Sequence, residues 1–182
     1  MSDNTGLQFT FTTQSLPEHT FNVVSFALNE GLSQVYSLSV ELSSILQEIS
    51  FGRMLDNTAE LQIWFNGVLQ RRINGVISRF SHSDTGNERT RYSVTLRPAI
   101  WMLSLEHSSR IFQQQTPQQI ITTLLRKANV IQFSFQLRYE HPMREYCVQY
   151  RESTLAFIER LAAEEGISWY FRFENNKQEI VF

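Results

Sequence analysis

Side chains that often carry out catalysis occur in this sequence, but they do not form a catalytic or metal-binding pattern. The four histidines are too far apart for any pair to be spaced as a metal chelate: His19, His82, His107 and His141. The only cysteine, Cys147, lies in an alternating segment and has no sequence neighbour that would activate a thiolate. We therefore expect histidines with structural roles, a buried inert thiol, and no bound metal or cofactor.

Paired carboxylates offer another route to catalysis, because one carboxyl can act as the acid and a second as the base. Glu159, Glu164 and Glu165 are close enough in sequence to be considered, but glutamates on a helix usually form a solvated face. The sequence also lacks a Gly-x-Ser-x-Gly nucleophile motif and a glycine-rich phosphate loop. These patterns favour a protein that is not an enzyme.

Glu164 and Glu165 also lie where anions are unfavourable, in the last turn of a predicted helix. The helix dipole destabilises a negative charge there by about 0.3–1 kcal/mol for each carboxylate. Our hypothesis is that at least one of them pairs with an arginine of a flanking strand, Arg151 or Arg172. Simple solvation of both carboxylates is the alternative.

Arginine is the most unusual feature of the composition, with fourteen arginines and only two lysines. Six arginines cluster in the second half of the N-terminal strands, namely Arg71, Arg72, Arg79, Arg89, Arg91 and Arg97. The planar guanidinium group binds carboxylates in a bidentate manner and is common at protein interfaces. We take these six residues as a candidate subunit or partner interface. An ordinary solvated sheet face is the alternative.

The overall composition is that of a globular protein. A chain of 182 residues can bury one core or two small ones. Sixteen basic and eighteen acidic side chains leave a net charge of −2, which provides no general basic field for nucleic acid or anionic lipid. The single cysteine fits a reducing compartment, and the first residues lack the features of a signal peptide. We expect cytoplasmic synthesis, no nucleic-acid partner and no stable membrane insertion.

Apolar and polar residues alternate along most of the first hundred positions, and this period of two is typical of strands with one wet face. Six strands are predicted, at about residues 7–12, 24–28, 36–43, 59–65, 69–80 and 90–97. Asn66-Gly67 predicts a type I′ hairpin, and the changed parity of Phe80 predicts a bulge near Gly75. Between the third and fourth strands we expect a short helical turn and a loop. Residues 1–104 are therefore predicted to form an antiparallel β-barrel.

The composition changes after about Ser104, and residues 105–182 are predicted to form a small α+β domain with two helices. Thr116-Pro117 begins the first helix as a cap followed by proline, and Asn129 ends it. Strands are expected at residues 131–139, 146–151 and 167–173. The second helix lies between Ser153 as its cap and Gly166 as its terminator. The apolar strand that ends at residue 182 suggests a truncated domain in a fragment of a longer protein.

Several segments resemble the VgrG family, the spike proteins of bacterial type VI secretion, which are related to baseplate hub proteins of contractile phage tails. The segments are Gly31-Leu32-Ser33, Tyr36-Ser37-Leu38, Asn74 to Phe80, Leu96-Arg97-Pro98 with Trp101, Ser109 to Gln113, and Val148 to Phe171. The resemblance extends from about residue 28 to the end. The sequence departs from the family pattern at Thr154 and Ala156, where acidic residues are frequent, and at Leu55-Asp56, where Leu-Gly is usual.

The resemblance implies a phage tail hub-like tube domain with a mechanical function. Such a protein would form a homotrimeric base that docks on the hexameric haemolysin-coregulated tube protein. Regions beyond residue 182 would puncture the target envelope and carry effectors or a tip protein. The protein would be cytoplasmic before firing and then secreted through the type VI apparatus. A baseplate hub protein of the late control type, from a contractile phage tail, is the second candidate.

Overall fold

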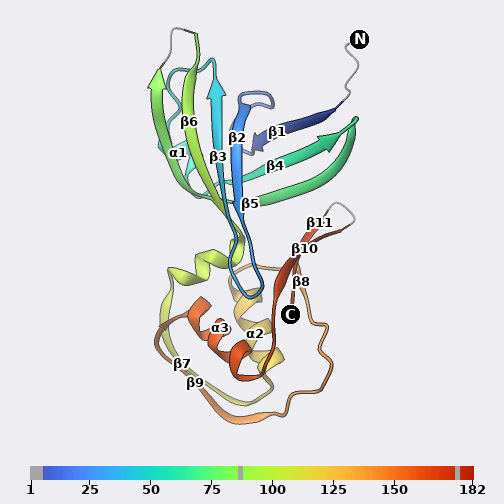
Figure 1. Ribbon diagram of the computed structural model, residues 1–182. Helices are drawn as coiled ribbons and strands as arrows, with labels where there is room; N and C mark the ends of the chain where they lie inside the picture. The colour runs from blue at the N-terminus through green and yellow to red at the C-terminus, as the bar shows by residue number, and fades with distance from the viewer. Residues whose placement is uncertain (1–5, 86–87, 175–176) are drawn as a thin grey trace. The chain divides into compact units, whose positions relative to one another are not determined.

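The computed structural model describes residues 6–85, 88–174 and 177–182 (Figure 1). The chain divides into two compact units, and each unit is built from segments that are not continuous in the sequence. The described residues of the first unit fall in Met1–Glu30, Tyr36–Pro98 and Phe173–Gln178. Those of the second unit fall in Gly31–Val35, Ala99–Arg172 and Glu179–Phe182. No helix among the described residues is both long enough and apolar enough to cross a membrane.

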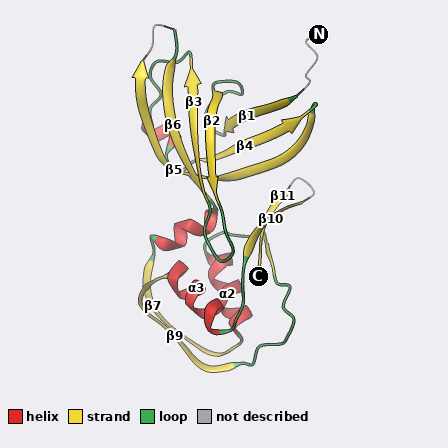
Figure 2. Cartoon of the chain, viewed as in Figure 1, coloured by secondary structure: helices red, strands yellow, loops and turns green. Residues whose placement is uncertain are grey.

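The first unit is a curled antiparallel sheet, and Figure 2 shows how strongly strands dominate it. Its strands are β1 (Leu7–Thr13), β2 (Asn22–Asn29), β3 (Ser37–Ser44), β4 (Thr58–Phe65), β5 (Val68–Thr85) and β6 (Thr90–Arg97). They pair in the order β1-β4-β5-β6-β3-β2, so that β1 and β2 are the edges. The prediction of a mainly β fold with an antiparallel N-terminal sheet is confirmed, and the sheet is curled into a half-barrel.

Residues that alternate along the strands form the core of the first unit. Buried residues of β3 are paired directly with buried residues of β6: Leu38 with Leu96, Val40 with Val94, and Leu42 with Tyr92. Phe80 of β5 stacks on Tyr92, with ring centroids 5.4 Å apart. Full burial of each such side chain stabilises the fold by roughly 1.5–3 kcal/mol.

Strand β5 contains a bulge, but not at the predicted position. The register of the β5–β6 pair shifts at Ser78, beyond Gly75. The extra residue lets Ile77 and Phe80, which have opposite parity, both face the core. Gly75 is needed for another reason, because a Cβ atom there would lie 2.5 Å from the carbonyl oxygen of Arg97. This glycine therefore permits the close approach of β5 and β6.

Two local predictions for the first unit are confirmed. Asn66 and Gly67 have φ angles of 49° and 73°, the positive values that a type I′ hairpin requires. The turn joins Phe65 of β4 to Val68 of β5, which are paired. Between β3 and β4 the chain forms one helical turn, α1 (Phe51–Met54).

The second unit contains two helices, the short 3-10 helix η1 (Ala99–Ser104) and several short strands. The helices are α2 (Pro117–Lys127) and α3 (Thr154–Glu164). The remaining strands are β7 (His107–Gln115), β8 (Phe133–Ser134), β9 (Arg144–Ser153), β10 (Tyr170–Glu174) and β11 (Lys177–Val181). The ends of β10 and β11 that fall within Phe173–Gln178 belong to the first unit, and the other residues of these strands to the second. β7 pairs with β9, and the other three strands form a sheet in the order β10-β11-β8.

Two strands of the second unit differ from the prediction. The predicted strand 131–139 is reduced to β8, which has two residues. β7 was not predicted, because its sequence HSSRIFQQQ is mostly polar and has no regular alternation of apolar side chains. Its half-buried side contacts a distant segment, since the Phe112 ring of β7 stacks on Phe157 of α3 with centroids 5.6 Å apart.

The predicted helix ends are confirmed. Thr116 and Gln119 form a reciprocal capping box at the start of α2. The Ser153 hydroxyl accepts a hydrogen bond from the backbone N–H of Ala156 at the start of α3. Gly166 has a φ of 68° directly after α3, and its N–H bonds to the carbonyl of Ala163.

Strand β9 alternates as predicted, but its larger apolar side chains face outward. Cys147 and Gln149 are buried, while Tyr146, Val148 and Tyr150 are exposed. The buried side packs on the core of the second unit, to which Cys147 belongs. Cys147 is therefore a buried free cysteine, as expected.

Candidate assembly surface

The six arginines of the candidate interface do not all share one face of the half-barrel. Arg91 and Arg97 alternate with buried residues of β6 and therefore lie on the face away from the core. Arg72 and Arg79 of β5 precede the core residues Ile73 and Phe80, so they lie on this same outer face. Arg71 is adjacent to Arg72 on β5 and therefore lies on the other face of the sheet. Arg89 precedes the start of β6.

Two of these arginines are neutralised within the first unit. Both carboxylate oxygens of Glu30 accept hydrogen bonds from Nη2 of Arg71, at 2.8 and 2.6 Å. Nε of Arg72 lies 3.3 Å from a carboxylate oxygen of Glu60 on the neighbouring strand β4. These pairs fix side chains across the sheet. The assignment of Arg71 and Arg72 to a partner interface stays a prediction.

Three arginines keep their charge available. Arg79, Arg89 and Arg91 are exposed, and none has an ion pair with another residue that the structure describes. The sixth, Arg97, is half-buried, and its carbonyl is packed against Gly75. Among the residues that the structure describes, three of the six arginines thus have no ion pair and lie on or beside one face.

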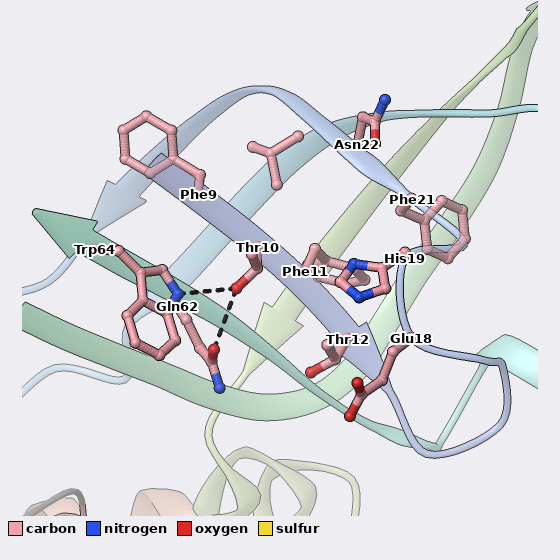
Figure 3. A pocket seen from close by; sticks show the side chains of 11 residues that line it. Phe9, Thr10, Phe11, Thr12, Glu18, His19, Phe21, Asn22, Gln62 and Trp64 are labelled. Atoms are coloured by element: carbon pink, nitrogen blue, oxygen red, sulfur yellow. Dashed lines mark hydrogen bonds between the residues drawn. The ribbon is translucent and has the colours of Figure 1, made fainter. Parts of the chain in front are cut away.

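An open hollow of about 430 Å³ lies beside the edge strand β1 (Figure 3). The Thr10 hydroxyl donates to Oε1 of Gln62 and accepts from Nε1 of Trp64, both at 3.1 Å, as the dashed lines show. Glu18 and His19 come from the turn before β2 and line another part of the hollow. These hydrogen bonds connect side chains of β1 and β4, so we interpret the polar residues of the hollow as stabilising the pairing of these two strands.

The carboxylates at the end of α3 are paired, which confirms that at least one of them binds an arginine. Nη1 of Arg144 lies 2.8 Å from Glu164, and Nε of Arg144 donates to Glu165 at 3.0 Å. His141 Nδ1 lies 2.7 Å from the other oxygen of Glu165. Nη1 of Arg160 contacts Glu164 at 2.8 Å. Hydrogen bonds from Arg144 and Arg160 lower the pKa of Glu164.

The partners that we expected for these carboxylates were wrong. Arg151 lies over the ring of Tyr150, 5.2 Å from its centroid. Arg172 pairs with Glu179 at 2.8 Å. The Arg160–Glu164 pair has a spacing of four residues and could have been read from the sequence as a helical ion pair.

Four of the residues considered for catalysis meet around Arg144: Glu164, Glu165 and Cys147 contact its guanidinium group, and His141 contacts Glu165. Burial raises the pKa of Glu159, whereas the pKa of Glu165 is lowered, since hydrogen bonds from Arg144 and His141 outweigh its burial. Within residues 6–85, 88–174 and 177–182, no three His, Cys, Asp or Glu side chains are grouped to hold a metal ion. The ionisable groups with altered pKa at the end of α3 are occupied in ion pairs with one another.

Comparison with known proteins identifies the class to which this architecture belongs. Residues 29–182 match the phage tail baseplate hub (GPD) family. The chain belongs to that family. A solved structure with the same fold is the E. coli c3393 protein, described as a component of the type VI secretion system with structural similarity to the T4 phage tail proteins gp27 and gp5. It has a TM-score of 0.85 and 28% identity, over 94% of this chain and 48% of the E. coli chain.

Within this class, similar curated relatives include a type VI secretion system spike protein and an actin cross-linking toxin. The spike protein VgrG3 of Vibrio cholerae is 37% identical over 97% of this chain and 18% of the relative. The actin cross-linking toxin VgrG1 of Vibrio cholerae is also 37% identical, over 97% of this chain and 17% of the relative. The chain thus spans less than a fifth of the length of these two relatives.

Proposed function

We propose that this chain is a structural part of a type VI secretion spike. The observation that carries the proposal is the 37% identity to a spike protein over nearly the whole chain, together with a half-barrel fold shared with a type VI component. In the complete protein, three copies form a homotrimeric base that docks on the hexameric haemolysin-coregulated tube protein. The complete protein is cytoplasmic before firing and is then secreted through the apparatus.

The work of this region is mechanical rather than enzymatic. Its strands, caps and ion pairs serve rigidity, and the acidic residues at the end of α3 are engaged by arginines. Envelope puncture, effector carriage and any tip protein belong to regions outside this sequence. The name of the actin cross-linking relative also fits this division, because the chain matches only 17% of that protein.

A baseplate hub protein of a contractile phage tail is the second candidate. The family description favours it, since the matched family is a phage tail baseplate hub. The identity of 37% to a type VI spike protein supports the secretion role more directly.

A two-part experiment tests the spike proposal. Light scattering on the complete protein is expected to give three times the mass of one chain. Deletion of its gene is expected to abolish release of the tube protein into the medium, and the wild-type gene should restore that release. A monomeric complete protein together with undiminished tube-protein release would contradict the proposal.

A further inference from the structure

The half-barrel is open between its two edge strands, β1 and β2. Among the described residues, each of these strands pairs with a neighbour on one side only, β1 with β4 and β2 with β3. The hollow beside β1 lies in this opening, because residues 9–12 of β1 and residues 21–23 at the start of β2 all line it.

The hollow runs along the free edge of β1. Successive side chains of a strand point to opposite faces, and Figure 3 shows Phe9 on one side of β1 and Thr10 and Thr12 on the other. Side chains from both sides line the hollow. The hollow therefore also passes the main chain between them.

Main-chain groups of alternate β1 residues point to this free edge. At one end of the β1–β4 pair the Gln14 N–H donates to the Thr58 carbonyl, and at the other end the Gly6 carbonyl accepts from the turn after β4. The register between these ends is regular, so the even-numbered residues turn their N–H and C=O groups to β4. Phe9 and Phe11 consequently turn theirs to the free edge, beside the hollow.

The two sides of the opening differ in polarity. On the inner side Phe9 meets Phe26 of β2 edge-on, with centroids 5.1 Å apart, and Phe11 meets Phe21 at 5.8 Å. On the outer side Thr10 is hydrogen-bonded to side chains of β4. A strand with one apolar and one polar face matches both sides.

The edge of β1 lacks the features that commonly protect an open edge, which are charges, proline and bulges. Neither β1, with the sequence LQFTFTT, nor β2, with NVVSFALN, contains a charged residue or a proline. β2 has a bulge at Val24, whereas β1 pairs with β4 without a register shift. β1 is therefore the edge to which another strand can add.

We propose that this opening accepts an extended peptide segment of a partner, which adds to β1 as a further strand. Main-chain hydrogen bonds to Phe9 and Phe11 provide affinity, and alternating apolar and polar side chains fit the two sides. Glu18 also lines the hollow, is exposed and has no ion pair with a described residue. A lysine or arginine at the end of the segment that lies beside Thr12 complements this charge. Strand addition here does not depend on the secretion role.

A synthetic peptide based on β4 serves as the probe, because the β4 sequence already pairs with the other edge of β1. In that pairing Ile63 lies opposite Phe9 and Leu61 lies opposite Phe11. The probe spans residues 58–65 with Glu60→Lys, which places a cation opposite Thr12. Fluorescence anisotropy of the labelled probe measures its binding to the complete protein.

Hydrogen exchange distinguishes strand addition from other modes of binding. The probe should slow exchange of the Phe9 and Phe11 amides and change that of Thr10 little, since Thr10 is already bonded to β4. Methylation of the probe at the backbone nitrogens of residues 61 and 63 removes donors to β1 and should weaken binding about tenfold. Methylation at residues 62 and 64, whose N–H groups point away from β1, is the matched control and should preserve binding.

The charge at Glu18 should decide between two probes. The wild-type protein is expected to bind the Glu60→Lys probe about threefold more tightly than the unchanged β4 sequence. Glu18→Lys should reverse this preference. Glu48→Lys makes the same change at an exposed carboxylate of the β3–β4 connection and should retain it. Unchanged thermal unfolding will show that each variant is folded.

The results decide as follows between strand addition and its alternatives. Protection of Phe9 and Phe11 with a reversed preference in Glu18→Lys supports the proposal. No probe binding, equal binding of the two methylated probes, or an unchanged preference in Glu18→Lys overturns it. Phe9 and Phe11 amides that are already protected without the probe also overturn it, because another part of the complete protein then covers the edge. The spike function is tested separately by trimer mass and tube-protein release.

Discussion

At the scale of single residues, paired charges dominate the second unit. Arg144 holds both Glu164 and Glu165 at the end of α3, where the helix dipole alone would disfavour two anions. Glu165 is the more buried of the two carboxylates, with 14% of its side chain exposed against 39% for Glu164. Its loss should therefore have the greater effect on stability.

Replacement of Glu165 by glutamine is expected to destabilise the fold. The amide cannot hold a charge-assisted pair with Arg144 or His141, and such hydrogen bonds contribute about 1.5–3 kcal/mol. Chemical denaturation should show the decrease in the free energy of unfolding. Glu145→Gln, at an exposed position, is the control and should be neutral within about 0.5 kcal/mol.

Two carboxylates paired with Arg160, those of Glu152 at 2.6 Å and Glu164 at 2.8 Å, predict a loss of stability in acid. Arginine contacts lower the pKa of Glu152 and Glu164 in the folded state, below the ordinary value of about 4.3. A lowered folded-state pKa stabilises the fold above the unfolded pKa, and this stabilisation disappears as pH falls through the folded value. Glu159, whose pKa is raised by burial, has the opposite effect and destabilises the fold as it ionises.

Thermal unfolding measured from pH 7 down to pH 3 checks this prediction. The melting temperature should decrease as the pH is lowered below about 4.5. The double variant Glu152→Gln with Glu164→Gln should have a lower melting temperature at neutral pH and a flatter acid decline. An identical pH profile for the variant and the wild type would contradict the assigned role of these pairs.

At the scale of elements, the close approach of β5 to β6 at Gly75 leaves no room for a side chain there. Gly75→Ala is expected to destabilise the half-barrel by about 1–3 kcal/mol, because the added methyl group would meet the backbone of Arg97 at 2.5 Å. Gly52→Ala in α1 is the matched control, since its Cβ would have no neighbour closer than 3.9 Å. Comparable stability of the two variants would show that β5 and β6 can separate without strain.

At the scale of the whole molecule, the two units are interleaved in sequence. Residues 31–35 belong to the second unit, and the Ser33 N–H donates to the Trp169 carbonyl at 2.6 Å. Ile100 and Leu103 of η1 are 0% and 2% exposed in the second core. The division between residues 1–104 and 105–182 that the sequence suggests stays a prediction.

Separate expression of residues 1–104 and 105–182 tests that division. We expect fragment 105–182 to lack a cooperative thermal transition, since it loses Ile100 and Leu103, and each buried side chain contributes roughly 2–5 kcal/mol. Fragment 99–182 retains both residues and is the control, with an expected gain in cooperativity. Calorimetry distinguishes the two, and a cooperative transition in 105–182 equal to that of 99–182 would contradict the expectation.

Much of this architecture is determined by short-range sequence patterns. The alternation on β3 and β6, the Asn66-Gly67 turn, the Thr116 and Ser153 caps and the Gly166 helix end are all present in the structure. Each depends on the conformational preferences of a few neighbouring residues, so the sequence alone predicts it.

Only the tertiary structure decided which side chains meet. Arg144 begins β9 and contacts Glu164 and Glu165, which lie at the far end of the following helix α3. The polar strand β7 pairs with β9 and packs on α3. Likewise, the structure pairs Arg71 with Glu30 and Arg72 with Glu60, and shows no ion pair of Arg79, Arg89 or Arg91 with a described residue. These outcomes depend on distances between segments that local preferences do not encode, because packing the core selects one arrangement among many with the same periodicity.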